Sequence, residues 1–298
     1  MGRPVRRTRP RGERGRGHHG RSRDINSVSA SGDVTGAIDA GHGIGGVTAG
    51  GNITSTITAG AAVGRLDDSD PRLPRHHPYW SSYDSPYWWG NGVRAGGDFT
   101  GLVTVGTDVS LVEAGGVVAG AIDAGRDVGF VDGSGGVSAA ITSGRDLGRV
   151  YAGGYGYTWS WWYSTWGELP DAPPTDFTGT IDAAGDVYGV FATGDVSGDV
   201  TAGGGIADVS AKGSVTGDIT AADSIGYLGD LVPDDGDYGE EWYYGNERYF
   251  GGGIVGGVDV AAVIEAGGDI TAVRAGRDIA GTITAGRDVG PLNAPRAT

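Results

Sequence analysis

The chain repeats itself every 19 residues, and this period constrains its fold more than any other feature. Each repeat joins a ten-residue unit of the form D-V-x-G-x-I-x-A-G-x to a nine-residue unit of the form D-I-G-x-V-x-A-G-x. The first apolar residue of the ten-residue unit recurs at Val34, Ile53, Phe99, Val118, Val137, Phe177, Val196, Val215, Val260 and Ile279. That of the nine-residue unit recurs at Ile44, Val63, Val109, Val128, Leu147, Val187, Ile206, Ile225, Ile270 and Val289. Short β-branched segments between Gly-rich turns at a fixed period predict stacked strands.

Each unit alternates in the manner of a strand. In the first ten-residue unit Val34, Gly36, Ile38 and Ala40 share one parity, so we expect them to face inward. The Ala-Gly that follows leaves room for a corner, where Gly can adopt positive φ. The Asp at the unit start suits a turn because its carboxylate can bond nearby backbone N–H groups.

We therefore predict an all-β fold, a parallel β-solenoid (β-helix) of about ten 19-residue coils. No segment shows the 3.6-residue period of a helix. The 61 Gly residues are then corner residues, and collagen is excluded because no G-X-Y period exists.

Three insertions interrupt the period, near residues 67–97, 153–175 and 229–258. They recur every third coil, and counting from the repeat columns predicts that all three leave the coil at the same corner, as a row of loops on one edge. The domain organisation predicted is an Arg/Gly-rich basic arm over residues 1–23 and a β-solenoid over residues 24–298.

The insertions hold every Trp of the chain and most of its Tyr. Because the predicted solenoid core is small and aliphatic, these rings cannot be its filling. Either they pack against a solenoid face and one another, or they contact a partner, another copy of the chain or a polysaccharide. The candidate contact residues are Trp80, Trp88, Trp89, Trp159, Trp161, Trp162, Trp166, Trp242, Tyr243 and Tyr244.

Charge is distributed unevenly between the arm and the rest of the chain. The whole chain carries a formal charge of −15, yet residues 1–23 hold nine Arg and a single acid. The arm is a candidate contact for an acidic surface, through Arg3, Arg6, Arg7, Arg9, Arg11, Arg14 and Arg16. It could contact phosphates, but the strongly acidic body opposes nucleic-acid binding, so we expect none.

Signals for catalysis or cofactors are weak. The Gly41, Gly43, Gly46 pattern matches a dinucleotide-binding motif, but the repeat generates it and no helix follows. We expect no enzyme activity and no cofactor. Loose Ca²⁺ binding is the alternative for two acidic clusters inside the insertions, Asp67, Asp68 and Asp70, and Asp234, Asp235 and Asp237.

One column of turn carboxylates invites a second interpretation. Successive nine-residue units start with Asp108, Asp127 and Asp146, and Arg126 and Arg145 precede two of them. Stacked carboxylates repel unless they are paired. We predict an Arg–Asp ladder, with a cation site as the alternative.

The segments "AGRDIAGTITAGRDVG" and "AGAIDAGRDVG" resemble the repeats of filamentous-haemagglutinin-type bacterial surface β-solenoids. The segment "GDVSGDVTAGGGIADVSAKGSVTGDITA" is similar, more weakly, to bactofilins, bacterial β-solenoids that polymerise. The resemblance implies a structural protein at the cell surface or outside the cell. No signal peptide is visible, so a cytoplasmic location is the alternative, and no apolar stretch is long enough to span a membrane.

The leading functional hypothesis is a non-enzymatic structural protein that assembles head to tail into a filament, because a solenoid end exposes strand edges that template further pairing. Alternatively, Pro291 and Pro295 end the rod. A surface adhesin that binds carbohydrate is the second hypothesis. A polysaccharide-active enzyme on a β-helix is the third.

Overall fold

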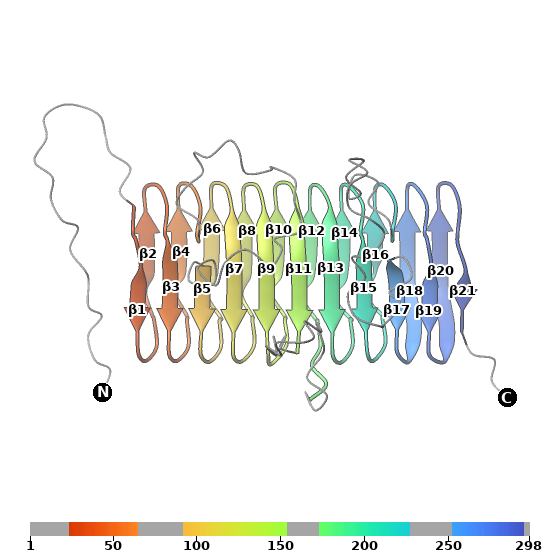
Figure 1. Cartoon of the computed structure of the whole chain (residues 1–298), viewed down its shortest axis with the longest axis horizontal. Helices are drawn as coiled ribbons and strands as arrows, with labels where there is room; N and C mark the ends of the chain where they lie inside the picture. Colours follow the sequence, from red (N-terminus) through yellow and green to blue (C-terminus); the bar gives the residue numbers. More distant parts are fainter. Residues whose placement is uncertain (1–23, 65–91, 154–172, 227–251, 295–298) are drawn as a thin grey trace, which may run out of the picture.

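The computed structural model describes residues 24–64, 92–153, 173–226 and 252–294. The described residues contain strands and turns and no helix, and every strand pair is parallel. They form an 11-stranded and a 10-stranded sheet, called sheet A and sheet B, whose strands stack side by side along one long axis (Figure 1). The predicted parallel β-solenoid is confirmed.

The chain alternates between the two sheets, so each coil contributes one strand to each. Sheet A contains β1 (Val28–Ala30), β3 (Gly46–Ala49), β5 (Gly92–Ala95), β7 (Val109–Ala114), β9 (Val128–Gly133), β11 (Leu147–Ala152), β13 (Val187–Ala192), β15 (Asp208–Ala211), β17 (Gly253–Gly256), β19 (Val273–Ala275) and β21 (Leu292–Asn293). Sheet B contains β2 (Ala37–Ala40), β4 (Thr56–Ala59), β6 (Leu102–Val105), β8 (Ala121–Ala124), β10 (Ala140–Ser143), β12 (Thr180–Ala183), β14 (Asp199–Ala202), β16 (Ile219–Ala221), β18 (Asp259–Ala266) and β20 (Asp278–Ala285).

The register follows the sequence repeat. In sheet B, Ile38 pairs with Ile57 and Ile57 with Val103, and the first apolar residues of the ten-residue units form a column of single parallel bridges that starts at Val34 and Ile53. Parallel pairing of equivalent residues places like side chains on top of one another. Both predicted columns are confirmed in this way, including the members beyond each insertion.

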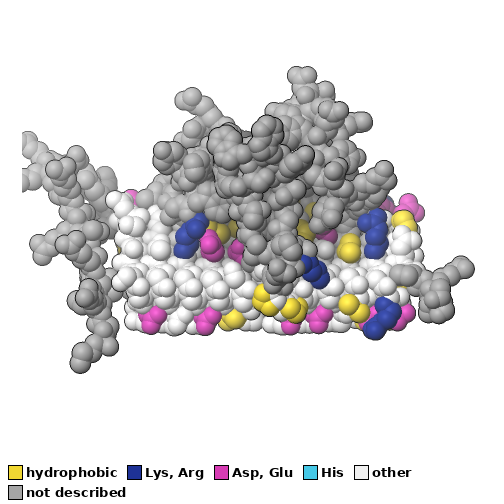
Figure 2. Space-filling model, turned by 60° about the horizontal axis from the view of Figure 1, so that its bottom comes forward, with side chains coloured by type: hydrophobic (Ala, Val, Ile, Leu, Met, Phe, Trp, Pro, Cys, Tyr) yellow, Lys and Arg dark blue, Asp and Glu magenta, His cyan; other side chains and the backbone are white. Residues whose placement is uncertain are grey.

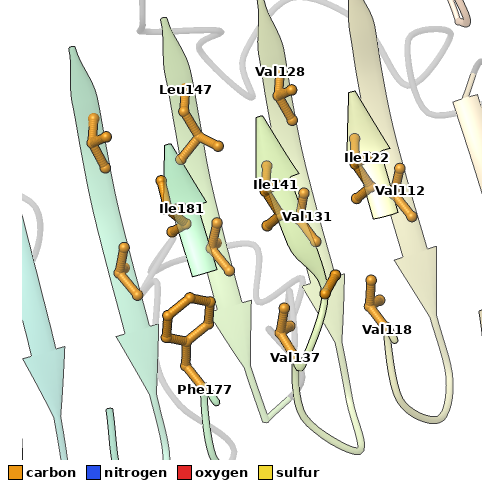
Figure 3. Packing of buried hydrophobic residues seen from close by; sticks show 14 of the residues in the cluster. Val112, Val118, Ile122, Val128, Val131, Val137, Ile141, Leu147, Phe177 and Ile181 are labelled. Atoms are coloured by element: carbon orange, nitrogen blue, oxygen red, sulfur yellow. The ribbon is translucent and has the colours of Figure 1, made fainter. Parts of the chain in front are cut away.

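The core is the space between the two sheets. Figure 3 shows Ile122, Ile141 and Ile181 of sheet B directed toward the same interior as Val112 and Val131 of sheet A. These five side chains are at most 2% exposed. Each coil therefore buries its apolar side chains against the coils before and after it, which makes the stability of one coil depend on its neighbours.

The corner glycines differ between the two kinds of unit. Gly153, after Ala152 of a nine-residue unit, adopts a φ of 122°. No described Gly at the corner that follows a strand of sheet B has positive φ, so the left-handed region does not explain Gly there. Instead, a Cβ on Gly60 or Gly125 would overlap the carbonyl oxygen of the equivalent residue one coil earlier. Close stacking of coils, rather than the left-handed region, thus favours Gly at this corner of sheet B, although Ala184 and Ala222 show that a methyl group can be accommodated. The residues at this corner are Gly41, Gly60, Gly106, Gly125, Gly144, Ala184, Gly203, Ala222, Gly267 and Gly286.

The prediction that Gly36 faces inward is also wrong. Gly36 is exposed and adopts a φ of 93°, so the first coil bends where the pattern expected a continuous strand. One coil later Ser55 occupies the same position with no exposure at all.

The insertions lie at different places in the coil than predicted. Val93 of β5 pairs with Val47, and Ile254 of β17 pairs with Val209, so residues 92–97 and 252–258 belong to coils. The repeat spacing alone also fits Leu66 and Leu228 to these strand positions, and both lie outside the described residues. Residues 65–91 and 227–251 therefore precede strands of sheet A, whereas residues 154–172 follow β11. Since β11 is parallel to the others, the insertions join opposite ends of sheet A strands, and the prediction that all three leave the coil at the same corner is wrong.

Candidate functional site

Side chains at the start of each unit connect successive coils. The Oδ1 atom of Asp33 accepts a hydrogen bond from the backbone N–H of Asn52 at 2.8 Å, and that of Asn52 accepts one from Asp98 at 2.7 Å. Asp98 in turn accepts from Val117 at 2.9 Å. The sequence argument expected these oxygens to cap N–H groups of their own turn, but they cap the equivalent residue one coil further on.

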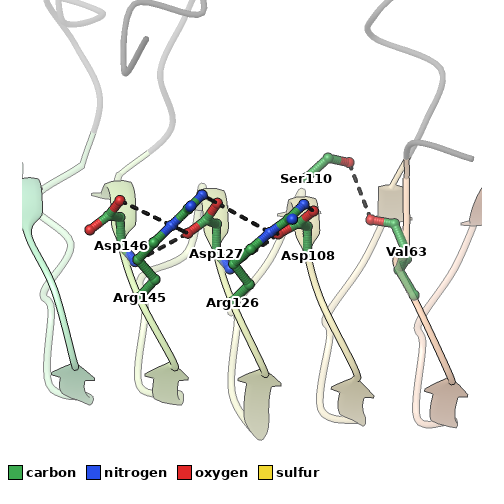
Figure 4. A network of polar contacts seen from close by, with 7 residues as sticks. All are labelled: Val63, Asp108, Ser110, Arg126, Asp127, Arg145 and Asp146. Atoms are coloured by element: carbon green, nitrogen blue, oxygen red, sulfur yellow. Dashed lines mark hydrogen bonds and ion pairs between the residues drawn. The ribbon is translucent and has the colours of Figure 1, made fainter. Parts of the chain in front are cut away.

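The nine-residue units carry a parallel ladder that includes Arg side chains (Figure 4). The Nε atom of Arg126 donates to Oδ1 of Asp108 at 2.7 Å, and that of Arg145 donates to Oδ1 of Asp127 at 2.7 Å. In both pairs Nη2 also contacts Oδ2, so the guanidinium holds the carboxylate with two bonds. The hydrogen bond with Asp127 raises the pKa of Arg145. The predicted Arg–Asp ladder is confirmed.

In the first described coil the ladder has a His side chain in place of Arg. Nδ1 of His42 lies 2.7 Å from Oδ1 of Asp24, which also accepts the backbone N–H of Gly43 at 3.0 Å. The Gly43 hydrogen bond, followed by that of His42, lowers the pKa of Asp24. His42 thus occupies the place that Arg126 and Arg145 take in later coils.

Every bond of these ladders has the same direction along the rod. The acceptor oxygen belongs to one coil and the donating N–H to the coil nearer the C-terminus. At the last coil the N–H of Asp278 donates to Asp259 at 3.2 Å, and that of Asp288 donates to Asp269 at 3.0 Å. No backbone N–H of the described residues donates to the carboxylates of Asp278 and Asp288 themselves. Within the described residues the ladders end at these two carboxylates, of which that of Asp278 lies 3.6 Å from Nε of Arg277.

The outer coils expose the apolar columns that the inner coils bury. Ile270 and Val273 are at most 1% exposed, whereas Val289 and Leu292, their equivalents one coil later, are 43% and 50% exposed. At the other end Ile25 and Val28 are only partly buried. Within the described residues no strand pairs with the outer edges of β1, β2, β20 and β21.

The outward face of sheet A carries a group of side chains that the sequence argument missed. Nη1 of Arg94 lies 2.9 Å from Oε2 of Glu113, and the rings of Tyr151 and Phe191 stack with centroids 5.2 Å apart. On β15 the Oδ1 atom of Asp208 is sealed from solvent and has no hydrogen-bond donor among the described residues. Burial raises the pKa of Asp208 to about 7. The parity of the nine-residue unit could have predicted that these positions share a face, but not that Arg94, Phe191 and Asp208 on it are partly buried.

The outward face of sheet B is simpler. Asp39, Thr58 and Thr104 stack in register and continue as a column of Thr and acidic residues. Figure 2 views the rod from another side, where acidic side chains lie at intervals along its length, with basic ones among them, rather than in one charged patch. This face offers no convergent set of reactive groups.

The candidate contact residues named from the sequence lie outside the described residues. This holds for all ten Trp and Tyr candidates and for the seven Arg residues of the arm. It also holds for both acidic clusters considered for Ca²⁺. Among the residues that the structure describes, no three His, Asp or Glu side chains are grouped to hold a metal ion. No helix of that part is long and apolar enough to cross a membrane.

Together the two sheets, the stacked columns and the directional ladders define a parallel β-solenoid repeat protein. No protein-family model, no curated protein and no solved structure matches the chain. The resemblance to haemagglutinin-type repeats and to bactofilins therefore stays a prediction.

Proposed function

We propose that this chain is a structural protein whose copies stack end to end into a filament. The observation that carries the proposal is the state of the outer coils, where no described residue covers the apolar columns of the core at the end of the described rod. Val289 and Leu292 are each more than two-fifths exposed, at positions where the inner coils have essentially no exposure.

Two properties of a strand edge favour the stacking of copies. An unpaired edge offers a row of N–H and C=O groups that another strand can pair with. Here the same edge also exposes apolar side chains. Stacking a second copy on it would pair the free N–H and C=O groups and also remove apolar surface from water. Because the two ends of the rod differ, contact between unlike ends does not close on itself and gives an open fibre.

Net charge opposes this assembly and sets the conditions for the test. With a formal charge of −15, copies repel one another at low ionic strength. Screening shortens the range of that repulsion to about 8 Å at physiological salt. Filament length should therefore increase with salt over this range.

The test is electron microscopy and sedimentation of the purified chain over a range of concentration and salt. We expect fibres of one rod width that lengthen with concentration. The variant Leu292→Asp should abolish them, because it places a charge on the exposed apolar column. The matched control Leu102→Asp changes a Leu that is 38% exposed in the middle of the rod, and its fibres should persist. Single rods under every condition would refute the proposal.

The adhesin and polysaccharide-active alternatives depend on the aromatic insertions. No described residue favours either of them, so the proposal rests on the outer coils alone.

A further inference from the structure

The outward face of sheet B carries acidic side chains without basic ones among them. No described strand of this sheet, from β2 to β20, contains Lys or Arg. Six carboxylates on these strands or directly beside one of them are exposed and form no ion pair within the described residues. We call them the acidic strip: Asp39, Asp123, Asp182, Asp199, Asp218 and Glu265.

The acidic strip is densest over four consecutive strands of sheet B, β12, β14, β16 and β18. Asp182, Asp199 and Glu265 lie on three of these strands, and Asp218 directly precedes β16. At about 4.8 Å per strand, the four carboxylates lie within roughly 15 Å along the rod. Like charges at this spacing repel one another unless a cation lies near them.

The missing cation distinguishes the strip from the acids of sheet A and the corners. On sheet A, Glu113 lies 2.9 Å from Nη1 of Arg94, and at the corner Arg126 holds Asp108. Within the strip, Oδ1 of Asp199 accepts the backbone N–H of Asp218 at 3.0 Å, which leaves the negative charge of both side chains uncompensated. The face therefore fits a cationic segment.

The chain itself contains such a segment, the arm of residues 1–23 with nine Arg and a single acid. The arm joins the rod at Asp24, whose Oδ1 accepts the backbone N–H of Gly43 at 3.0 Å. Gly43 lies in the corner that directly follows β2. The arm is therefore attached at the edge of sheet B, next to the column that begins with Asp39.

The arm is long enough to reach the densest part of the strip. Five steps of sheet B lead from β2 to β12 and eight lead to β18, which correspond to about 24 Å and 38 Å. An extended segment of 23 residues spans up to roughly 75 Å. Because a short tether holds its end at an effective concentration in the millimolar range, docking within one chain is favoured over docking on a second copy.

We propose that the acidic strip of sheet B is the docking surface for the Arg-rich arm of the same chain. Guanidinium groups bind carboxylates with paired hydrogen bonds, and the nine Arg of the arm outnumber the six carboxylates of the strip. The contact uses a lateral face of the rod, so it does not depend on stacking at the ends.

Disulfide trapping in the full chain tests this contact, because the chain contains no Cys. Thr8→Cys in the arm is combined with Thr201→Cys, an exposed position of β14 in the column that also holds Asp182 and Glu265. The matched control combines Thr8→Cys with Thr48→Cys, which is exposed on β3 of sheet A. Since β3 is the second strand of its sheet and β14 the seventh of its own, an undocked arm would meet Thr48 more often.

We expect the pair with Thr201→Cys to form its intramolecular disulfide about tenfold faster than the control pair at low salt. Three or four exposed ion pairs together supply a factor of this size. The advantage should disappear at 1 M salt, where the screening length is about 3 Å.

Neutralising the strip separates its charge from the general attraction of an acidic rod. We expect the advantage to be lost in the combined variant Asp182→Asn, Asp218→Asn and Glu265→Gln. The control removes the same charge outside the strip, at unit starts whose ladder bonds an Asn retains as Asn52 does, and should keep the advantage: Asp98→Asn, Asp176→Asn and Asp195→Asn.

Two results would overturn the inference. One is equal trapping of the two pairs, or faster trapping of the pair with Thr48→Cys. The other is disulfide dimers in a mixture of Thr8→Cys and Thr201→Cys chains that form as fast as the intramolecular bond, because the arm then docks on a second copy. Rates are measured on single chains in dilute solution, so they do not depend on whether filaments form.

Discussion

Making the side chain at Phe177 smaller and that at Gly198 larger is the sharpest test of how adjacent coils pack. Phe177 is fully buried in a column that otherwise holds mainly Val and Ile. A Cβ on Gly198, in the next coil, would lie 2.7 Å from Cε1 of that ring and would overlap the carbonyl oxygen of Gly179. The ring therefore fills the space that a side chain at Gly198 would need.

Other coils show the opposite combination. Where the earlier coil has Val118 or Val215 in this column, the position equivalent to Gly198 is Ala139 or Ala262. Both Ala residues are buried, at 0% and 4% exposure. Changing Phe177→Val together with Gly198→Ala therefore reproduces an arrangement that the chain already uses twice.

The expected magnitudes follow from the two separate defects. Phe177→Val leaves a cavity and should cost about 2 kcal/mol, less than the range for truncation to Ala. Gly198→Ala alone overpacks the site and should cost about 2 kcal/mol. In the double variant the new methyl group enters the space that the Phe177 ring leaves. We therefore expect the double variant to lose about 2 kcal/mol of unfolding free energy in total, which corresponds to a coupling free energy of about 2 kcal/mol between the two positions.

The assay is urea unfolding followed by circular dichroism, analysed as a double-mutant cycle. The control replaces Gly217, whose added Cβ would meet the carbonyl of Gly198 but no ring. Phe177→Val and Gly217→Ala should be additive. Additivity in both cycles would refute the packing argument.

Two further predictions concern single positions. Asp208→Asn should change the pH dependence of stability: since the folded pKa of about 7 lies above the unfolded value of 3.8, the folded state binds more protons between these values. Asp208 therefore makes stability fall as pH rises from about 4 through 7. In thermal melts at a series of pH values, the Asn variant should lack this decrease in stability with pH. An equal decrease in both proteins would contradict the burial of Asp208. Gly51→Ala should cost about 1–2 kcal/mol, because its Cβ would displace the Asp33 carboxylate that caps the next coil. The same change at Gly32, one coil earlier and with nothing within 4 Å, should be neutral or slightly stabilising in the same melts.

Much of the fold could be predicted because the repeat is strict. Val34 and Ile53 occupy the same position of two similar ten-residue units, which predicts the same place in the coil, and parallel stacking then follows from the strand-like alternation. The Arg126–Asp108 contact was predictable for the same reason, since the period alone places the two side chains one coil apart.

The errors arose where the repeat is ambiguous. Leu66 and Val93 both satisfy the apolar position after Val63, and only pairing of Val93 with Val47 and Val112 decides between them. Pro291 directly precedes β21, the outermost described strand of sheet A, and its carbonyl accepts the N–H of Val273, so the alternative that Pro291 and Pro295 end the rod stays a prediction. Pro lacks only the donor, so an acceptor role in the outermost strand remains open to it.

The sequence by itself determined the coil: its period, its inward columns and the residues that start each unit. These are local properties, because alternation and turn preference depend on neighbouring residues in the chain. Only the tertiary structure decided what the coils do to one another. It showed that a Cβ at corner glycines such as Gly60 would meet the carbonyl of the coil before, and that the side-chain oxygen at the start of a unit accepts an N–H from the coil after. Within the described residues, no backbone N–H donates to the carboxylates of Asp278 and Asp288. Such contacts join residues 19 positions apart, and their direction along the rod appears only once the coils are stacked.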